Sequence, residues 1–514
     1  MPTKLSFKHL SRLSIMLFIT TKKHDLLQRT VNSIQQQSCS QWDLTIIISD
    51  KETFNIDKSL LTNLKAPAYT LLFSTLPPHK IVAKAKGKYI LFMASGDSLE
   101  QDFVLHFFQQ QQKIPFLRLF YTDHCFFSSQ SEQVLTTHFK PDWNPDYLTS
   151  FNYIAHAVIF YRYDLLAISE PLENGEKDYF HQLLLTISEQ YKQDQIYHLA
   201  ISVFQIASHK KKEIIKKNIL ARYFYHSNTV YRPSFSLPNI IPFVSIIIPT
   251  KNQFKLLKQC VESLLEKTTY ARFELLIIDN QSDEPETLDY LQQLSLLNTI
   301  RVLPYPNAFN YSAINNFAVK QAKGSLLVFL NNDTEIINSN WLDEMLIHAL
   351  RPEIGCVGAK LYYPDKTIQH GGVILGIYGS ASHAHKHFPE DHAGYFNRLI
   401  SVHNLSSVTA ACLMMRKSVF EQVGGFDEVS LKVAYNDVDL CLKVLAQGYR
   451  NLWTPYAELI HYESKSRGKK RSWWQRRKLR KEERFLKQKW GDLLLNDPAY
   501  NPNLTLDRED FSIK

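Results

Sequence analysis

Cysteine, glycine and proline are all scarce in this sequence. Its 514 residues include six cysteines, none in a Cys-x-x-Cys pair, so neither a disulfide framework nor a structural zinc module is expected. We therefore expect a protein of a reducing compartment, the cytoplasm. Only 16 glycines and 21 prolines are present, which excludes collagen-like and low-complexity chains. At roughly 100–200 residues per domain, the length predicts a globular protein of two to four domains.

The sequence also lacks an apolar run long enough to span a bilayer. The run Leu13–Ile19 follows several basic residues, as in a signal peptide, but it is short and leads into Thr-Thr-Lys-Lys rather than a cleavage site. We interpret it as a buried first strand.

Positive charge is confined to one segment. The net charge is +9, and residues 465–490 alone contain thirteen Lys or Arg against only Glu482 and Glu483. This pattern predicts a basic helix carrying Trp473 and Trp474. A solvated helix, contact with an anionic membrane surface and contact with nucleic acid all remain open for it.

The chain contains an internal repeat of about 230 residues. Near the start the chain reads SIMLFITTKKHDLLQRTVNSIQQQSCSQWDLTIIISD. From Ser245 a similar segment reads SIIIPTKNQFKLLKQCVESLLEKTTYARFELLIIDN. Further on, AKAKGKYILFMASGDS is answered by VKQAKGSLLVFLNNDT. Each copy reads as strand, helix, strand, which predicts an α/β fold with a doubly wound, mostly parallel sheet. The proline-rich stretch 232–242 marks the linker.

Polar residues follow three predicted strands of the second copy, at the strand ends where ligands bind in parallel sheets. An Asp after a buried strand can contact a nucleoside or supply an oxygen ligand to Mg²⁺ or Mn²⁺, although it is often only a turn or cap residue. The three clusters are Pro249-Thr250-Lys251-Asn252, Asp279-Asn280 and Asn331-Asn332-Asp333.

Two later segments carry further candidates. Asn436, Asp437 and Asp439 open an amphipathic helix, where acids either favour the helix dipole or include a general base in a cleft. His461 ends a predicted strand, as a structural residue or as a further metal ligand.

The second copy resembles the family 2 glycosyltransferases with the GT-A fold, from about Val244 onward. The likeness rests on motifs in family order, among them SIIIPTKN, LLIIDNQSD, FLNNDTE, VGAKLYYPDKTIQHGGV, TAACLMMR, GGFDE, YNDVDLCLK, TPYAELIHYES and WGDLLLNDPAYNPNL. The repeat is similar to a bacterial subgroup with two fused modules, associated with O-antigen, rhamnan and related surface polysaccharides. On this resemblance we expect a degenerate module over 1–232, a linker over 233–243, a catalytic module over 244–464 and a basic helical extension over 465–514.

The resemblance also implies roles for individual residues. Asp437 would be the general base, and Asp333 and His461 would hold Mg²⁺ or Mn²⁺, although Asn331 stands where many relatives have Asp. The implied nucleotide-sugar site comprises Pro249, Thr250, Asn252, Asp279, Asn280, Asn332 and Asp333, and the acceptor side comprises Asp427, Asn436 and Asp439.

The implied reaction is an inverting transfer from a nucleotide-diphosphate sugar to a hydroxyl of a lipid-linked or polysaccharide acceptor. The expected location is the cytoplasm, peripheral on the inner face of the membrane, and no nucleic acid partner is expected. A non-catalytic glycan or nucleotide-sugar scaffold, and an enzyme with both modules active, are the alternatives.

The first copy has lost most of these residues when the copies are aligned through Gly87 and Gly324. Ala94-Ser95-Gly96 replaces Asn331-Asn332-Asp333, with Asp97 one position away. Ile48 takes the place of Asp279, with Ser49 and Asp50 next to it. The same count sets Asp178 opposite Asp437, Phe180 opposite Asp439, and the neighbourhood of Gln205 opposite His461. It predicts a surviving base without a metal site, and most simply a scaffold or acceptor-binding module.

A histidine-rich segment in the second copy has two interpretations. His383, His385 and His387, with His392 after them, could bind a transition metal through alternating imidazoles or form a mobile loop on the acceptor side.

Overall fold

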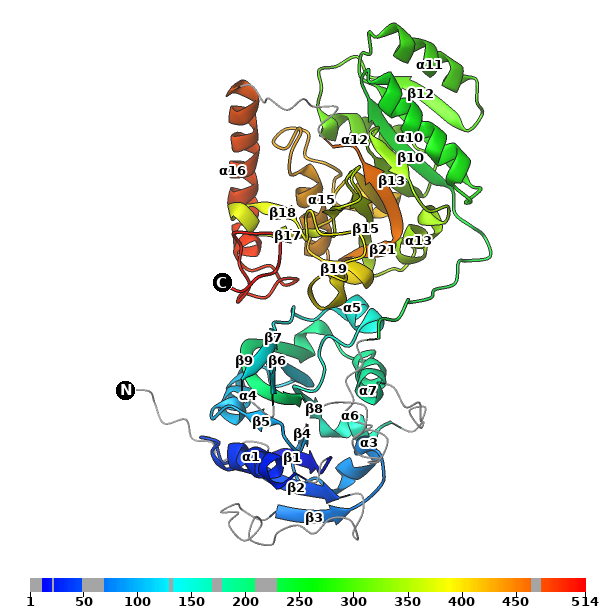
Figure 1. Ribbon diagram of the computed structural model, residues 1–514. Helices are drawn as coiled ribbons and strands as arrows, with labels where there is room; N and C mark the ends of the chain where they lie inside the picture. Colours follow the sequence, from blue (N-terminus) through cyan, green and yellow to red (C-terminus); the bar gives the residue numbers. More distant parts are fainter. Residues whose placement is uncertain are drawn as a thin grey trace. The chain divides into compact units, whose positions relative to one another are not determined.

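The computed structural model describes residues 12–20, 23–48, 69–128, 133–168, 178–208, 229–463 and 473–514. The chain divides into two compact units (Figure 1). The first comprises Met1–Trp143 and Phe151–Thr229, and the second comprises Asn144–Ser150 and Val230–Lys514.

The first unit is a mixed sheet covered by helices. Its strands lie in the order β3-β2-β1-β4-β8-β6-β9-β5, with β7 on β6. The elements are β1 (Leu13–Phe18), α1 (His24–Gln35), β2 (Trp42–Ile48), β3 (Tyr69–Phe73), α3 (Pro78–Ile81), β4 (Tyr89–Ala94), β5 (Ser98–Leu99), α4 (Phe103–Lys113), β6 (Leu119–Ser128), β7 (Val134–His138), β8 (Val158–Tyr161), α6 (Arg162–Leu166), α7 (Tyr179–Ser188) and β9 (Ile196–Ser208).

The second unit repeats this strand order as β12-β11-β10-β13-β20-β15-β21-β14. Its elements are α5 (Pro145–Ser150), β10 (Val244–Thr250), α10 (Phe254–Lys267), β11 (Phe273–Asp279), α11 (Pro285–Ser295), β12 (Ile300–Pro304), α12 (Tyr311–Gln321), β13 (Leu326–Leu330), β14 (Thr334–Ile336), α13 (Trp341–Ala349), β15 (Ile354–Tyr362), β16 (Ile368–His370), β17 (Val373–Leu375), β18 (Ala381–His383), β19 (His403–Leu405), β20 (Cys412–Arg416), α14 (Lys417–Gln422), α15 (Asn436–Ala446), β21 (Arg450–His461) and α16 (Trp473–Leu495).

The two units share buried contacts as well as strand order. In the first, the Ser14 hydroxyl donates to Asp43 at 2.9 Å and accepts from the Gly87 amide at 2.8 Å. In the second, Ser245 makes the same pair of bonds, to Glu274 at 2.7 Å and from Gly324 at 2.8 Å. A Cβ on either glycine would lie within 2.5 Å of backbone atoms, so both positions require glycine. The sequence repeat is therefore a structural repeat.

The strands that open each unit are buried on both faces. Every residue of β1 is buried, as predicted for Leu13–Ile19, and it pairs in parallel with β2 and β4. Several strands of each sheet depart from the predicted parallel arrangement, and the one inside each sheet is β8, antiparallel to β4 and β6, and β20, antiparallel to β13 and β15. The sequence contains no hairpin signal for this reversal, because the strands involved are distant along the chain.

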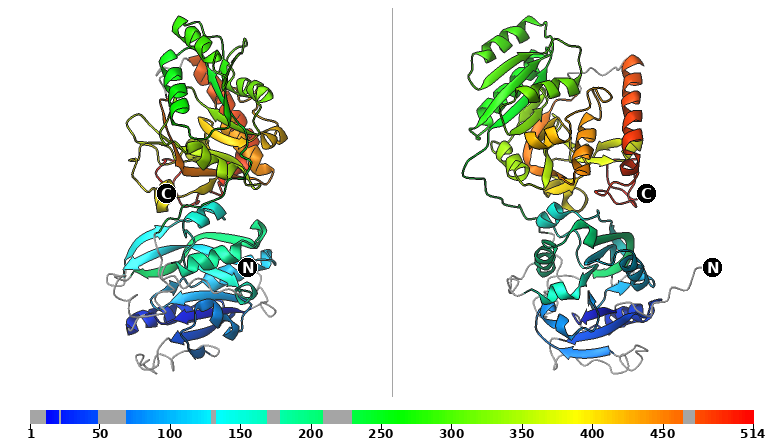
Figure 2. Two further views of the ribbon diagram at one scale, coloured as in Figure 1. Left: turned by 90° about the vertical axis from the view of Figure 1, so that its right-hand side faces the viewer. Right: turned by 180° about the vertical axis from the view of Figure 1, so that it is seen from behind.

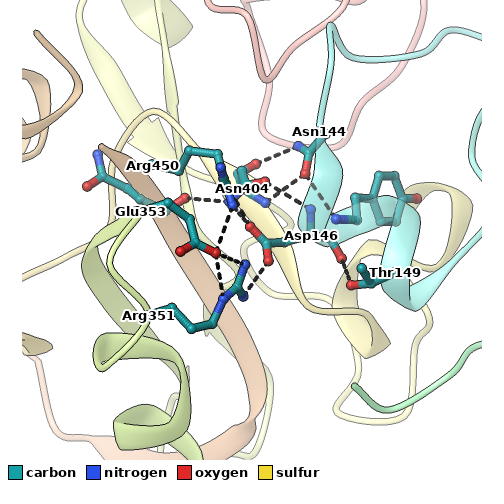
Figure 3. Close-up of polar contacts among 9 residues, drawn as sticks. Asn144, Asp146, Thr149, Arg351, Glu353, Asn404 and Arg450 are labelled. Carbon is teal, nitrogen blue, oxygen red and sulfur yellow. Dashed lines mark hydrogen bonds and ion pairs between the residues drawn. The ribbon is translucent and has the colours of Figure 1, made fainter. Parts of the chain in front are cut away.

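Helix α5 comes from the first half of the sequence but belongs to the second unit. Asp146 is 1% exposed, and its carboxylate lies 2.5 Å from Arg351 Nη1 and 3.4 Å from Arg450 Nε (Figure 3). Asn404 donates to the same carboxylate at 2.6 Å and accepts from the Asp146 amide. Burial alone would raise the pKa of Asp146, but the two guanidinium groups outweigh it and lower that pKa. A buried carboxylate thus holds α5 in the second unit.

The basic segment includes a long helix, α16, at one edge of the second unit (Figure 2). Residues 465–472 of the predicted extension, and residue 464 before them, lie outside the described residues. Leu486 and Leu494 pack into an apolar cluster with Val438 and Leu442 of α15. The opposite face carries the exposed cations Arg480, Lys481 and Arg484, with exposed Lys487 at its border, and exposed Lys478 lies one turn before Glu482. The helix is therefore two-sided.

Candidate active site

The carboxyl ends of β10, β11 and β13 are tied together by side-chain amides. Asn332 donates to the Thr250 hydroxyl at 2.9 Å, which joins the loop after β13 to the end of β10. Asn280 is buried and donates to the carbonyl of Asn307 at 2.7 Å and of Tyr305 at 3.2 Å. The predicted cluster of strand ends thus exists, and Asn280 acts in it as a brace.

Asn252 closes the other side of this cluster. Its side-chain oxygen accepts from the amides of Asp283 and Glu284, while its own amide nitrogen donates to Asp283 at 2.6 Å. Asp279 is half-buried at the end of β11, where it accepts from the Ser282 amide at 3.1 Å, and Pro249 is half-buried beside it. These contacts set the loop geometry around the predicted nucleotide pocket.

Asp333 and His461 meet in a buried pair. His461 Nε2 lies 3.1 Å from Asp333 Oδ1, and His461 Nδ1 lies 2.7 Å from Gln369 Oε1. Gln369 donates its amide nitrogen to Glu463 at 3.1 Å, which points its oxygen at the imidazole. With this amide orientation, a neutral imidazole would carry its proton on Nδ1 and would present Nε2 to the carboxylate.

This pair fits a divalent cation. A bare imidazole nitrogen and a carboxylate oxygen facing each other are both electron donors, and a cation between them would relieve their repulsion. Asn331, whose amide nitrogen lies 3.2 Å from Nε2, adds no charge. Among the described residues, no group of three or more His, Cys, Asp or Glu side chains is placed to hold a metal ion.

Asp437 lies in the first turn of α15, half-buried. Its Oδ2 accepts from the Ala410 amide at 3.1 Å, and its Oδ1 accepts from the Val438 amide. The next residue, Ala411, accepts from the Asn331 amide at 3.0 Å. Residues 410 and 411 therefore connect the predicted base directly to the loop that carries Asp333.

The three predicted acceptor-side residues lie in different settings. Asp427 accepts from the amides of Val429 and Ser430 in an open turn, and Asn436 is buried, with its oxygen on the Asp437 amide. Asp439 is fully buried and accepts from Lys489 at 2.6 Å and from Trp490 at 2.8 Å. The structure thus turns Asp439 toward α16.

The histidines of the 382–392 segment point to different partners. His385 stacks on Phe511, His387 stacks on Tyr363, and His392 accepts from the Gly394 amide. His383 instead contacts His370, with 3.1 Å between their Nδ1 atoms. The described side chains therefore do not converge on a shared metal site.

The first unit carries apolar residues where the second has its polar cluster. When the strand registers of the two sheets are matched, Ile48 takes the position of Asp279, Gly96 that of Asp333 and Ile206 that of His461. Ser49 and Asp50 lie outside the described residues. Asp97 is one position away from Gly96 and accepts from the Ala94 amide, and burial raises its pKa to about 7.

The predicted match of Asp178 with Asp437 is wrong by two residues. Helices α7 and α15 each follow one residue with left-handed backbone, Asp178 and Tyr435 respectively, so Phe180 takes the place of Asp437. The ring of Phe180 packs on His156, which the strand registers set opposite Ala411. The described part of the first unit therefore has no counterpart of the base.

Gln369 and Glu463 were missed by the sequence reasoning. Both lie inside motifs that carry the family resemblance, TIQHGG and LIHYES, but no role was assigned to them. The available signal was general: ligating histidines donate their second ring nitrogen to an oxygen acceptor, but nothing in the sequence places Gln369 beside His461.

Residues 245–424 match the model of Glycosyl transferase family 2. This part of the chain therefore belongs to the family 2 glycosyltransferases, and the mixed α/β strand order of the unit that contains it recurs in the first unit. The predicted family and fold class are confirmed.

Two curated relatives extend over most of the chain. It is 36% identical to the uncharacterized protein y4gI of Sinorhizobium fredii, over 97% of this chain and 58% of the relative. It is 34% identical to the O-antigen biosynthesis protein RfbC of Myxococcus xanthus, over 84% of this chain and 35% of the relative. The chain thus spans only part of the length of either protein.

A solved mannosyltransferase, PcManGT from Pyrobaculum calidifontis in complex with GDP-Man and Mn²⁺, is 15% identical over 46% of this chain and 61% of its own, with a TM-score of 0.34. In the described part of the chain, no helix combines the length and the apolar character that crossing a membrane requires.

Proposed function

We propose that the second unit is an inverting glycosyltransferase that moves a sugar from a nucleotide-diphosphate donor to a hydroxyl of a bacterial surface glycan of the O-antigen type. The observation that carries the proposal is the connection of Asp437 to the Asp333–His461 pair through residues 410 and 411. It links a candidate base to a candidate diphosphate site within one unit.

The donor would lie over the strand ends of β10, β11 and β13. Asp279 would accept from the base or ribose, and Pro249, Thr250, Asn252, Asn280 and Asn332 would shape the pocket. Asp333 and His461 would hold Mg²⁺ or Mn²⁺, which supplies neutralisation of the charge that develops on the departing diphosphate. Gln369 would keep the imidazole of His461 in the ligating tautomer.

Asp437 would accept the proton of the acceptor hydroxyl as that oxygen attacks the anomeric carbon. The new carbon–oxygen bond forms on the face opposite the diphosphate, whose bond to the same carbon breaks, so the configuration inverts. The Ala410 and Val438 amides would fix the carboxylate for this attack. Asn436 is the first residue of α15 and Asp427 precedes that helix along the chain, and both are proposed to line the acceptor side.

The discriminating experiment is hydrolysis of a panel of nucleotide sugars with and without Mn²⁺. A transferase releases nucleoside diphosphate slowly from one donor, and chelation stops the release. A non-catalytic scaffold binds without turnover. Turnover that survives loss of Asp333 would instead indicate activity in the first unit.

The exposed cations of α16 support a peripheral place on the inner face of the cytoplasmic membrane. Each Lys or Arg close to an anionic leaflet contributes about 1 kcal/mol of attraction, screened within about 8 Å at physiological salt. Cosedimentation with anionic vesicles across a salt series tests this. A variant with Lys478, Arg480, Lys481 and Arg484 changed to Gln should bind less, and equal binding would leave α16 a solvated helix.

A further inference from the structure

We propose that α16, through its buried face, is a positioning element for Asp437. This inference rests on the proposed function, because it concerns the placement of the proposed base. Its basis is a set of contacts that α16 makes with α15 and with the residues just before it.

The first contact is the buried ion pair of Asp439. Its carboxylate is fully buried and receives Lys489 Nζ at 2.6 Å and Trp490 Nε1 at 2.8 Å on one oxygen. Lys443, one turn along α15, lies 3.7 Å from the other oxygen. A buried carboxylate requires such partners, because removing them leaves an uncompensated charge. Lys489 and Trp490 are therefore needed to hold the first turn of α15 against α16.

The second contact is made by Glu482, one of the two acids between residues 465 and 490. Its side chain is 3% exposed and accepts from the Ala434 amide at 2.7 Å and from the Val433 amide at 3.3 Å. These amides immediately precede Tyr435, whose left-handed backbone starts α15. Glu482 therefore fixes the chain at the point where α15 begins.

The two contacts share one side of α16. Glu482, Leu486, Lys489 and Trp490 are spaced at four, seven and eight residues, which places them on one face of a helix, whereas the exposed cations Arg480, Lys481 and Arg484 lie on the other. Asp437 and Asp439 are two residues apart, so their side chains point to nearly opposite sides of α15. Holding Asp439 against α16 thus sets the rotation of the first turn and the direction of Asp437.

Such positioning has a measurable effect on rate. Displacement of a reacting group by about 1 Å can lower the rate on the order of 100-fold without weakening substrate binding. We expect Lys489→Met in the full-length protein to lower kcat by about tenfold or more, with unchanged nucleotide affinity. Lys489→Arg, which restores the cation, should recover most of the activity.

The matched control is Lys487→Met, which removes a cation from the same helix whose partner is the surface residue Glu483. It should behave as the wild type in an assay without membranes. The decisive measurement combines Lys489→Met with Asp437→Asn. If Lys489 acts through the base, its effect on kcat disappears in the Asp437→Asn background, whereas a merely structural role gives additive losses.

The outcomes separate the two proposals. If the wild-type protein turns over no nucleotide sugar, the proposed function fails. If the wild type is active and Lys489→Met has the kcat of the wild type, or if the two substitutions are additive, the positioning role of α16 is wrong while the transferase stands.

Discussion

The two units share a strand order and a buried serine contact, yet among the described residues only the second unit has the polar strand ends of a site. Ser14 and Ser245 make equivalent bonds to a carboxylate and a glycine amide, deep in each sheet. At the sheet edge, Ile206 stands opposite His461 and Phe180 opposite Asp437. The contacts that maintain the fold therefore lie apart from the residues proposed to carry the chemistry, and one set can persist without the other.

The largest expected effect comes from Asp437→Asn. It should lower transfer by about two to four orders of magnitude, the usual contribution of a positioned base, and leave donor affinity unchanged. The matched control is Asp178→Asn in the first unit, the residue that sequence counting aligns with Asp437. Steady-state kinetics of both variants test the comparison, and a comparable loss in the control would show that the first unit takes part in the reaction.

The second largest effect is expected from loss of the Asp146 contacts that hold α5 in the second unit. Asp146→Leu removes the buried one of the two carboxylates that Arg351 and Arg450 share and leaves them only Glu353, and we expect a loss of about 3–5 kcal/mol in the free energy of unfolding of the second unit. The control is Glu262→Gln, which breaks an exposed pair with Lys258 and should cost under about 0.5 kcal/mol. Urea denaturation compares them, and similar midpoints would contradict the anchoring role.

The same anchor predicts a pH dependence. Because the folded pKa of Asp146 is lowered, its contribution is fully present above the ordinary carboxyl pKa of about 3.9 and is lost as the pH falls through the folded pKa. The stability difference between the wild type and Asp146→Asn should therefore be constant near neutrality and shrink below about pH 4. A difference that persists unchanged into stronger acid would exclude the charge as its source.

A smaller effect is expected at the proposed metal pair. Asp333→Ala should weaken Mn²⁺-dependent donor binding by about 100-fold, since outer-shell changes alone cost about 10- to 100-fold. Asp97→Asn, on the corresponding loop of the first unit, should leave that binding unchanged. Calorimetric titration measures the donor affinity of both variants with and without Mn²⁺. Mn²⁺-dependent binding that survives Asp333→Ala would locate a donor site elsewhere in the chain.

The smallest effect should be the same in both units. Ser14→Ala and Ser245→Ala each leave a buried carboxylate and a glycine amide without their shared hydroxyl, at a cost of about 1–3 kcal/mol. Hydrogen exchange resolved by unit measures the two losses separately. Unequal losses would mean that the shared contact has lost its importance in one unit.

Sequence reasoning was strongest where pattern and geometry coincide. The repeat anchored on Gly87 and Gly324, and the buried strand from Leu13, followed from local composition because continuous apolar runs and obligatory glycines have few alternatives. Sequence reasoning was weakest where the two copies differ in the number of residues between equivalent elements. The loop before α7 differs in length from the one before α15, so counting set Asp178 opposite Asp437 when the helix starts set Phe180 there.

Contacts between distant segments were also beyond its reach. Nothing near Asp146 in the sequence indicates that its partners are Arg351 and Arg450, some 200 and 300 residues away. For Asp439 a signal was present, since two residues along a helix turn a side chain to the far face. The resemblance to the family motif had placed both Asp437 and Asp439 in one predicted site.

The position of α5 bears on how such a chain can change by recombination. An exchange of genetic material at the proline-rich border would join the second half to a foreign first half. A hybrid without an acid in that place would keep Arg351 and Arg450 but lose Asp146, and the two guanidinium groups would retain only the carboxylate of Glu353. Selection would then remove most hybrids, so the two halves of the chain are expected to be inherited together even where the first performs no chemistry.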